Sequence, residues 1–277
     1  MKNMGKDESE PMICAISSSI ANFYEKILWH YRGLPWHPLR DIFHSVVFFG
    51  LYHEADYAKY ALHRGDKTVV WCGSDILRLQ KSWFGQHVVK HFRARHICEN
   101  EVEQNALSLL GISAQVRYIF YEDPNDFPVS FVPSKTPHVF LHCHGGKDAA
   151  YGKVQSGLNI IERLYRRTPW VTFHIYGIDK LSHNNICYHG HVLNEQFNRE
   201  IRNYQAGLRL HAFDGISEIM VKSVLLGQYP ITVIPYPHID LVRDEKELVK
   251  RLKELRYKKK PHPYRDWWFQ ELMKKSV

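Results

Sequence analysis

The feature that most constrains the fold is a repeated alternation between short, continuous apolar runs and helix-like segments. Residues 45–50 (SVVFFG) and 67–75 (KTVVWCGSD) are nearly continuous apolar runs, and segments with helical spacing follow them at 53–65 and 83–95. A strand that is apolar along its whole length is buried on both faces, as the strands of parallel sheets are. The alternation therefore predicts an α/β protein whose parallel sheet is covered by helices on both sides.

A proline-rich segment divides this alternation into two series. Residues 122–137 (EDPNDFPVSFVPSKTP) hold four prolines and few helix formers, which is typical of a linker. Apolar runs and helical segments resume at 138–146 and continue to 231–236. We therefore expect two Rossmann-like domains, at residues 1–127 and 138–250, and a helical tail at 251–277.

Composition and charge limit the class of protein and its partners. The 277 residues are 44% hydrophobic, which is enough apolar material for packed cores and excludes a disordered chain. A formal net charge of +8 favours anionic partners such as nucleotides, phosphorylated sugars, nucleic acid or an acidic membrane surface. Part of the excess lies at 246–260 (KELVKRLKELRYKKK), a segment with two interpretations. It is either a solvated helix packed by its leucines or an attachment to a membrane or nucleic acid.

Cysteine content and hydropathy bear on the compartment. The five cysteines include no C-x-x-C pair, which favours reduced thiols over a disulfide framework. The N-terminal residues do not resemble a secretory signal, and no apolar run approaches the roughly 18 residues of a membrane-spanning helix. We expect a cytoplasmic protein, with peripheral contact to a membrane left open.

Three loops of the second series carry residues suited to a ligand, because ligands of open α/β sheets bind at the carboxyl ends of the strands. In HGGKDAAYGK (144–153), two lysines could hold a diphosphate, or they could be solvated on a surface loop. YHGHV (188–192) places a glycine between histidines, each of which is more simply read as a packed or hydrogen-bonded residue. In AFDGIS (212–217), Ser217 can cap a helix whose N-terminus would suit a phosphate, and Asp214 can accept hydrogen bonds from sugar hydroxyls. Alternatively, Asp214 only forms an Asx-type turn.

The order of these elements resembles a known family. FHIYG (173–177), NICYHGHV (185–192) and the run at 204–234 together resemble the donor-binding half of GT-B glycosyltransferases, most closely the retaining family 4. In that family a strand ends in glycine, a G-x-V turn follows, and a further strand leads to an acidic residue and a helix. GGKDAAYGK resembles the family's diphosphate-binding segment, and 45–121 looks like a shortened acceptor-side domain. The resemblance implies two Rossmann-like domains facing across a cleft, with a C-terminal helix crossing back to the first domain.

The resemblance also implies roles for residues. Lys147 and Lys153 would clasp the donor diphosphate, and Asp214 would stand at the first acid of the family's E-x7-E motif and contact the transferred sugar. The second acid falls at Lys222, so Glu218 would substitute for it or Lys222 would contact phosphate. The implied donor-binding set is Gly146, Lys147, Lys153, Gly190, His191, Val192, Arg209, Gly215, Ile216, Ser217, Glu218 and Lys222.

The acceptor side offers fewer candidates. His53 and Asp75 follow the two apolar runs of the first series, where they could orient a sugar or transfer a proton, or simply cap helices. With Asp214 they form the candidate catalytic set. The family generally acts without a bound metal, because cationic side chains and a helix dipole neutralise the leaving diphosphate. His142 and His144 lack a spaced second pair, so zinc is not expected.

The sequence therefore favours a glycosyltransferase that moves a sugar from a nucleotide diphosphate donor to an acceptor hydroxyl, with retention and without a metal. The acceptor would be a glycan, a lipid-linked molecule or another hydroxyl compound. Two alternatives stay open, given the basic charge and the lysine at position 222. One is a nucleotide- or nucleic-acid-binding α/β protein without transferase activity, and the other is a transferase acting on modified DNA.

Overall fold

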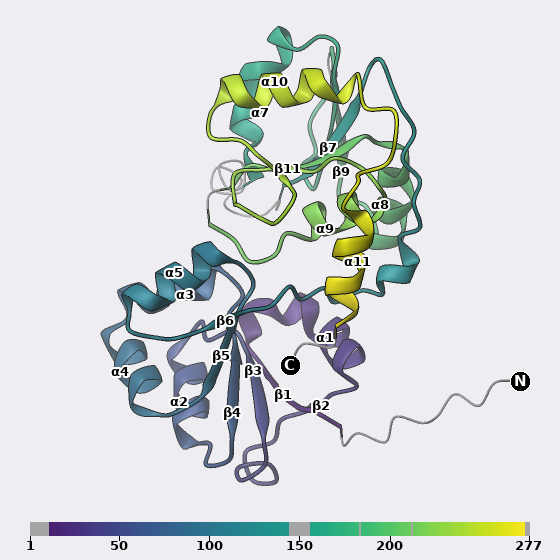
Figure 1. The fold of residues 1–277 in the computed structure, drawn as a ribbon. Helices are drawn as coiled ribbons and strands as arrows, with labels where there is room; N and C mark the ends of the chain where they lie inside the picture. The colour runs from purple at the N-terminus through teal and green to yellow at the C-terminus, as the bar shows by residue number, and fades with distance from the viewer. Residues whose placement is uncertain (1–10, 144–155, 183, 212, 275–277) are drawn as a thin grey trace, which may run out of the picture. The chain divides into compact units, whose positions relative to one another are not determined.

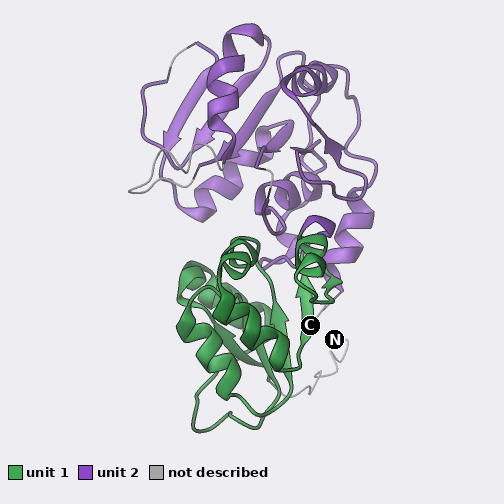
Figure 2. Cartoon of the chain, turned by 90° about the vertical axis from the view of Figure 1, so that its left-hand side faces the viewer, with its two compact units in different colours: residues 1–99, 103–117, 277 green, residues 100–102, 118–276 purple. Residues whose placement is uncertain are grey.

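The computed structural model describes residues 11–143, 156–182, 184–211 and 213–274, which fall into two compact units (Figure 2). Unit 1 holds the described residues up to Glu99 together with Glu103–Arg117, and unit 2 holds Asn100–Val102 and the described residues from Tyr118 onward. The chain passes from one unit to the other at Arg117 and Tyr118, so the proline-rich segment expected as a linker belongs to unit 2.

Unit 1 is built on a parallel six-stranded sheet (Figure 1). Its strands lie in the order β2 (Leu34–Pro35), β1 (Ile13–Ile16), β3 (Val46–Phe49), β4 (Lys67–Val70), β5 (Arg95–Cys98) and β6 (Gln115–Val116). The helical elements are η1 (Ser18–Phe23), α1 (Tyr24–Tyr31), α2 (Glu54–Leu62), α3 (Ser74–Lys81), α4 (Trp83–His91) and α5 (Glu101–Leu109). All four residues of β3 are buried, as its continuous apolar sequence predicts.

Unit 2 has a second parallel six-stranded sheet. Its order is β12 (Asp240–Leu241), β11 (Ile231–Thr232), β10 (Ala206–Arg209), β7 (His138–His142), β8 (Thr172–Tyr176) and β9 (Ile186–Gly190). Counted from β7, this is the 3-2-1-4-5-6 order of a doubly wound dinucleotide-binding fold. The strand order reverses between β7 and β10, so the carboxyl ends of these two strands flank the crevice where such folds bind ligands.

Helices cover both faces of the sheet in unit 2 and enclose two cores (Figure 1). α7 (Leu158–Leu164) and α10 (Glu245–Leu255) bury their leucines in one core, where Leu248, Leu252 and Leu255 are the α10 contribution. α8 (Asn194–Glu200), α9 (Glu218–Leu225) and α11 (Arg265–Met273) enclose the other, which contains the fully buried Trp268. The short helices η2 (Pro124–Asp126), η3 (Tyr165–Arg167) and η4 (Ile201–Asn203) complete the unit. Among the described residues, no helix combines the length and apolar character that crossing a bilayer requires.

A row of three histidines crosses strands β7, β8 and β9 of unit 2. His138 Nδ1 lies 2.8 Å from His174 Nε2, and His174 Nδ1 lies 2.9 Å from His189 Nε2. The row ends near Glu200, whose carboxylate is 3.8 Å from His189 Nδ1 and accepts a 2.7 Å hydrogen bond from a tyrosine hydroxyl of β8. Burial, together with the neighbouring imidazoles His138 and His189, lowers the pKa of His174 to about 3. Burial also lowers the pKa of His138 and of His189, so the row is neutral at pH 7.

The histidine row predicts a loss of stability in mild acid. The unfolded chain binds a proton at His174 near its ordinary pKa of 6.5, whereas the folded chain does so only near 3, so stability falls as pH falls below about 6.5. When the pH is lowered from 7.5 to 5.5, the unfolding free energy of His174→Gln should fall by about 1.4 kcal/mol less than that of the wild type. The variant lacks the imidazole that takes up a proton when the chain unfolds. Urea unfolding at the two pH values measures this. His87→Gln, at an exposed position of α4, should keep the wild-type difference.

Candidate functional site

The loop that leaves β10 holds the strongest candidate residues. Asp214 lies close to Arg209 at the end of β10, whose guanidinium Nε donates a 2.7 Å hydrogen bond to Asp214 Oδ2 and whose Nη2 contacts the same oxygen. Asn100 Nδ2 donates a 2.7 Å hydrogen bond to the backbone carbonyl of Asp214. Arg209 is almost fully buried, whereas the Asp214 side chain is 28% exposed. Arg209 therefore holds the carboxylate through Oδ2, and the side chain still reaches solvent.

The next residues form the start of α9. Ser217 is the N-cap of this helix, and its hydroxyl accepts from the backbone N–H of Met220 at 3.5 Å. The Tyr236 hydroxyl donates a 2.7 Å hydrogen bond to the Gly215 carbonyl, which fixes the turn between Asp214 and the cap. Ile216 is half-buried beside the second core. An acidic side chain thus precedes a helix N-terminus, whose first N–H groups have no partner within the helix and favour an anion.

Lys222 and Glu218 project from α9, one helical turn apart. The Lys222 side chain is only 1% exposed, and its ammonium donates to Glu122 Oε1 at 3.0 Å and to Asn194 Oδ1 at 3.4 Å. Glu218 Oε2 lies 3.7 Å from the same ammonium. Two acidic side chains therefore surround the lysine that occupies the position of the expected second acid. A phosphate could reach the ammonium only by displacing these acceptors.

The turn after β9 carries three further candidates. Gly190 has a φ of +65°, and a Cβ at this position would lie 2.1 Å from Asp179 Oδ1, so the turn requires glycine. Gly177, at the end of β8, donates its backbone N–H to the Gly190 carbonyl at 2.7 Å. His191 is exposed and Val192 is half-buried. The turn therefore presents one exposed side chain, His191, beside a backbone that requires glycine at position 190.

In unit 1, the two acceptor-side candidates have different surroundings. His53 is exposed at the N-cap of α2, with Nε2 2.7 Å from the Ser19 hydroxyl and Nδ1 3.3 Å from an Arg78 nitrogen. Asp75 is fully buried in the first turn of α3, where its carboxylate accepts from the backbone N–H groups of Cys72 and Ile76. Burial raises the pKa of Asp75 to about 7, although these hydrogen bonds oppose the shift. Its contacts are those of a capping residue, and only His53 reaches solvent.

The diphosphate-loop candidates Gly146, Lys147 and Lys153 lie outside the described residues. Of the others, Arg209, Asp214, Gly215, Ser217, Glu218 and Lys222 lie along the β10–α9 connection. The residues in contact with this group that were not predicted from the sequence include Asn100 and Glu122. They contact partners 114 and 100 positions away, so no local pattern could have indicated them.

The outer face of α10 carries a stripe of three lysines. Its glutamates are ion-paired, Glu245 with Arg163, Glu247 with Arg243 and Glu254 with Arg251. Lys246, Lys250 and Lys253 are exposed, lie opposite the buried leucines, and form no ion pair with a described residue. Leu248, Leu252 and Leu255 are buried, as the first of the two interpretations of this segment predicts, and the lysines lie on the opposite face.

Comparison with solved structures identifies the fold. The chain is similar to a mutant of Staphylococcus aureus TarM in complex with fondaparinux, α-GlcNAc-glycerol and UDP (10% identity, TM-score 0.58, 84% of this chain and 52% of TarM). It is similar to the pneumococcal O-GlcNAc transferase GtfA in complex with UDP and GlcNAc (12% identity, TM-score 0.52, 82% of this chain and 53% of GtfA). It is also similar to Anabaena HepE in complex with UDP (11% identity, TM-score 0.59, 88% of this chain and 89% of HepE).

These similarities show that the chain has the fold of GT-B glycosyltransferases, with a Rossmann-like sheet in each unit. The chain spans about half the length of the TarM and GtfA structures that it matches. No protein-family model matches the chain, and no curated protein sequence matches it.

Proposed function

We propose that the protein is a glycosyltransferase that moves a sugar from a nucleotide diphosphate donor to a hydroxyl group of an acceptor. The observation that carries the proposal is the position of Asp214 at the switch point of the unit 2 sheet, directly before the N-terminus of α9. A sugar diphosphate needs hydrogen-bond acceptors for its hydroxyls beside positive potential for its phosphates. TarM, GtfA and HepE, which share the fold, were each solved with bound UDP.

In this proposal, different residues of unit 2 bind different parts of the donor. Asp214 Oδ1, which accepts no hydrogen bond from a described residue, receives one from a hydroxyl of the transferred sugar. The N–H groups from Gly215 to Ser217, with Lys147 and Lys153, bind the diphosphate, and Gly146 allows close approach of the backbone. The turn Gly190, His191 and Val192 lies beside the base, and Glu218 contacts the ribose. Arg209 holds Asp214 in place.

Catalysis would rest on charge rather than on a metal. The backbone N–H groups of α9 and the two loop lysines neutralise the leaving diphosphate, which is the role that a divalent cation otherwise fills. We propose retention of the anomeric configuration, following the resemblance to the retaining family. On the acceptor side we propose that His53, rather than the buried Asp75, contacts the acceptor hydroxyl, in a cytoplasmic compartment.

Donor binding can be tested with a thermal-shift panel of UDP-, GDP- and TDP-sugars, in EDTA and in magnesium or manganese. One donor should raise the melting temperature, because a ligand that binds only the folded state stabilises it. At about 100 times its dissociation constant the gain would be about 2.7 kcal/mol. The rise should be equal in EDTA and in metal. A rise that requires manganese would contradict the metal-independent part of the proposal.

The α10 lysine stripe supports a second proposal, contact with a polyanionic partner. Such contact would weaken steeply as salt rises, because bound cationic side chains release counterions. The triple variant Lys246→Glu, Lys250→Glu and Lys253→Glu should elute from a heparin column at clearly lower salt than wild type. A matched triple change to Glu at Lys81, Lys90 and Arg93 of unit 1, which are also exposed, should have a smaller effect. Equal elution of the two variants would exclude α10 as the contact surface.

A further inference from the structure

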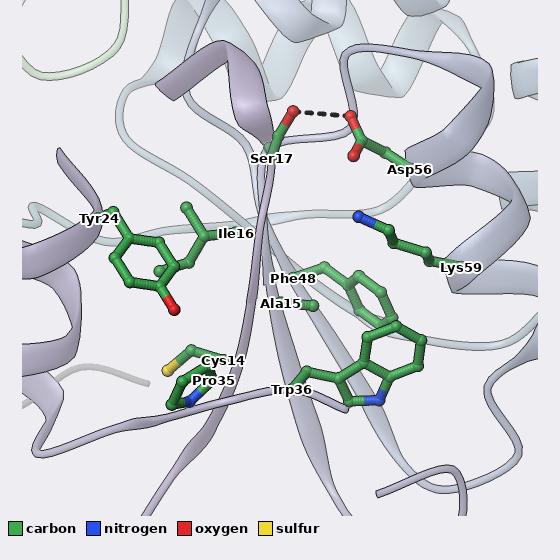
Figure 3. Close-up of a pocket in the computed structure, with 11 residues that line it drawn as sticks. Cys14, Ala15, Ile16, Ser17, Tyr24, Pro35, Trp36, Phe48, Asp56 and Lys59 are labelled. Atoms are coloured by element: carbon green, nitrogen blue, oxygen red, sulfur yellow. Dashed lines mark hydrogen bonds between the residues drawn. The ribbon is translucent and has the colours of Figure 1, made fainter. Parts of the chain in front are cut away.

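A small cavity in unit 1 lies between β1, β3 and α2, apart from the residues considered so far for donor binding (Figure 3). It has a volume of about 100 Å³. Ala15 and Ser17 line it from alternate positions of the β1 segment, and Phe48 lines it from β3. Figure 3 shows Phe48, Trp36, Lys59 and Asp56 on one side of β1 and Tyr24 on the other.

One end of the cavity is polar and contains both a carboxylate and a cation. The buried Asp56 accepts three hydrogen bonds on a single oxygen, Oδ2, from the Ser17 hydroxyl at 2.7 Å and from the backbone N–H groups of Tyr52 at 3.0 Å and His53 at 3.1 Å. Its other oxygen, Oδ1, accepts no hydrogen bond from a described residue. Lys59, one turn further along α2, forms no ion pair with a described side chain, and Figure 3 shows its ammonium group directed towards β1.

The charges at this end select the ligand. An anionic group would be repelled by the Asp56 carboxylate, and a cationic group would be repelled by the Lys59 ammonium. Binding of either kind of charged group is therefore disfavoured. A hydroxyl group suits both, since it can donate to a carboxylate oxygen and accept from an ammonium. The polar end is therefore suited to neutral hydroxyl groups.

The other end of the cavity is aromatic. The rings of Trp36 and Phe48 line it, with the small side chain of Ala15 leaving space beside them. The C–H groups of a saccharide ring are apolar and pack favourably on the negative face of an aromatic ring. The Trp36 indole N–H is buried and has no hydrogen-bond partner among the described residues, so the ring also carries an unused donor.

The volume limits the ligand further. Ligand pockets for drug-sized molecules have volumes of about 300–1,000 Å³, and a water molecule takes about 30 Å³ of liquid volume. A cavity of about 100 Å³ is too small to enclose a nucleotide. It can take one edge of a sugar ring or a short polyol, with the rest of the ligand outside.

We infer that this cavity is a binding subsite for a neutral saccharide or polyol, held by hydroxyl contacts to Asp56 and Lys59 and by packing on Trp36 and Phe48. In the context of the proposed glycosyltransferase, this ligand is part of the acceptor, and that identification rests on the proposed function. The binding itself does not depend on a nucleotide donor.

The test is saturation-transfer NMR on the full chain without nucleotide. The probes are glycerol, glucose, galactose and N-acetylglucosamine, with glucuronate as the anionic comparison. At least one neutral probe should bind saturably with a dissociation constant in the millimolar range, which corresponds to about −4 kcal/mol. Lys59→Met and Trp36→Ala should each weaken this binding about tenfold, as loss of one direct contact predicts. Trp36→Phe, which keeps the aromatic packing, should retain most of it.

Matched controls lie on α4, where Lys90 and Trp83 are exposed. Lys90→Met and Trp83→Ala should bind the neutral probe as the wild type does. The inference is overturned if no neutral probe binds saturably, if glucuronate binds more tightly than the neutral sugars, or if the cavity variants match the controls. Thermal shifts with the nucleotide sugars on the same variants separate the two proposals. If a nucleotide sugar raises the melting temperature but no neutral probe binds, only the cavity proposal is overturned. If a neutral probe binds but no nucleotide sugar raises the melting temperature, only the transferase proposal is overturned.

Discussion

Replacing Asp214 by asparagine should lower the turnover number for sugar transfer by about 10–100-fold, the value of one charge-assisted hydrogen bond of about 1.5–3 kcal/mol. The asparagine side chain keeps the size of Asp214 and can still accept from the Arg209 guanidinium, now observed 2.7 Å from Oδ2. It cannot supply negative charge to the sugar hydroxyl. Nucleoside diphosphate release under saturating donor measures the change.

Stability must be measured beside turnover, because Arg209 is nearly buried and loses its charged partner in this variant. We expect the unfolding free energy to fall by about 1 kcal/mol, the typical value of one hydrogen bond. Asp244→Ala is the matched control, since Asp244 caps α10 through a 2.8 Å bond from the Glu247 N–H, loss of such a cap costs about 1 kcal/mol, and the residue lies outside the proposed site. It should lose a similar amount of stability and keep its turnover. Equal losses of turnover in the two variants would mean that Asp214 only shapes the turn.

Replacing Glu122 by glutamine should give the largest loss of stability, about 3–5 kcal/mol, because it leaves a buried ammonium without its main partner. Glu122 accepts from Lys222 at 3.0 Å and from the amides of Asn194 and Asn198 at 3.1 Å each. A glutamine amide in its place would direct N–H groups at one of these donors. Unfolding free energies from urea titration measure the effect.

Lys222→Met should cost less than Glu122→Gln, because the freed Glu122 carboxylate keeps two amide donors and is 12% exposed, whereas the Lys222 side chain is 1% exposed. Lys180→Met serves as the control, since it removes a solvent-exposed ion pair with Glu162 that should contribute about 1 kcal/mol or less. The reverse order of the two buried variants would show that the lysine does not depend on Glu122 for its burial.

The sequence predicted most strands of both sheets and missed three of them, β1, β2 and β12. The runs that became β3, β4, β7, β8 and β10 are four or five residues long and lie inside their sheets. β2 and β12 have two residues each and lie at sheet edges, where neither length nor hydrophobicity separates a strand from a loop. β1 was missed because four residues next to a polar N-terminus give no periodic pattern. The helix α3 was also missed although its sequence is clearly amphipathic, because only residues 71–73 separate it from β4 and the predicted strand ran on to position 75.

The candidate site shows the same division between local and distant contacts. The cap at Ser217 and the glycine at 227 that follows α9 could be predicted because both are encoded within a few residues. The burial of Lys222 could not, because it depends on Glu122, which is 100 positions earlier in the sequence. The burial of Asp75 likewise depends on how the start of α3 packs against its strand, which the order of residues alone does not specify.

The central claim is that the protein catalyses sugar transfer from a nucleotide diphosphate donor. The most direct measurement is release of nucleoside diphosphate from each donor of the panel, with glycerol and neutral monosaccharides as acceptors and EDTA present. We predict release above the buffer rate for one donor, a product that retains the anomeric configuration by NMR, and loss of both in Asp214→Asn. Release at the buffer rate for every donor, with and without metal, would contradict the claim.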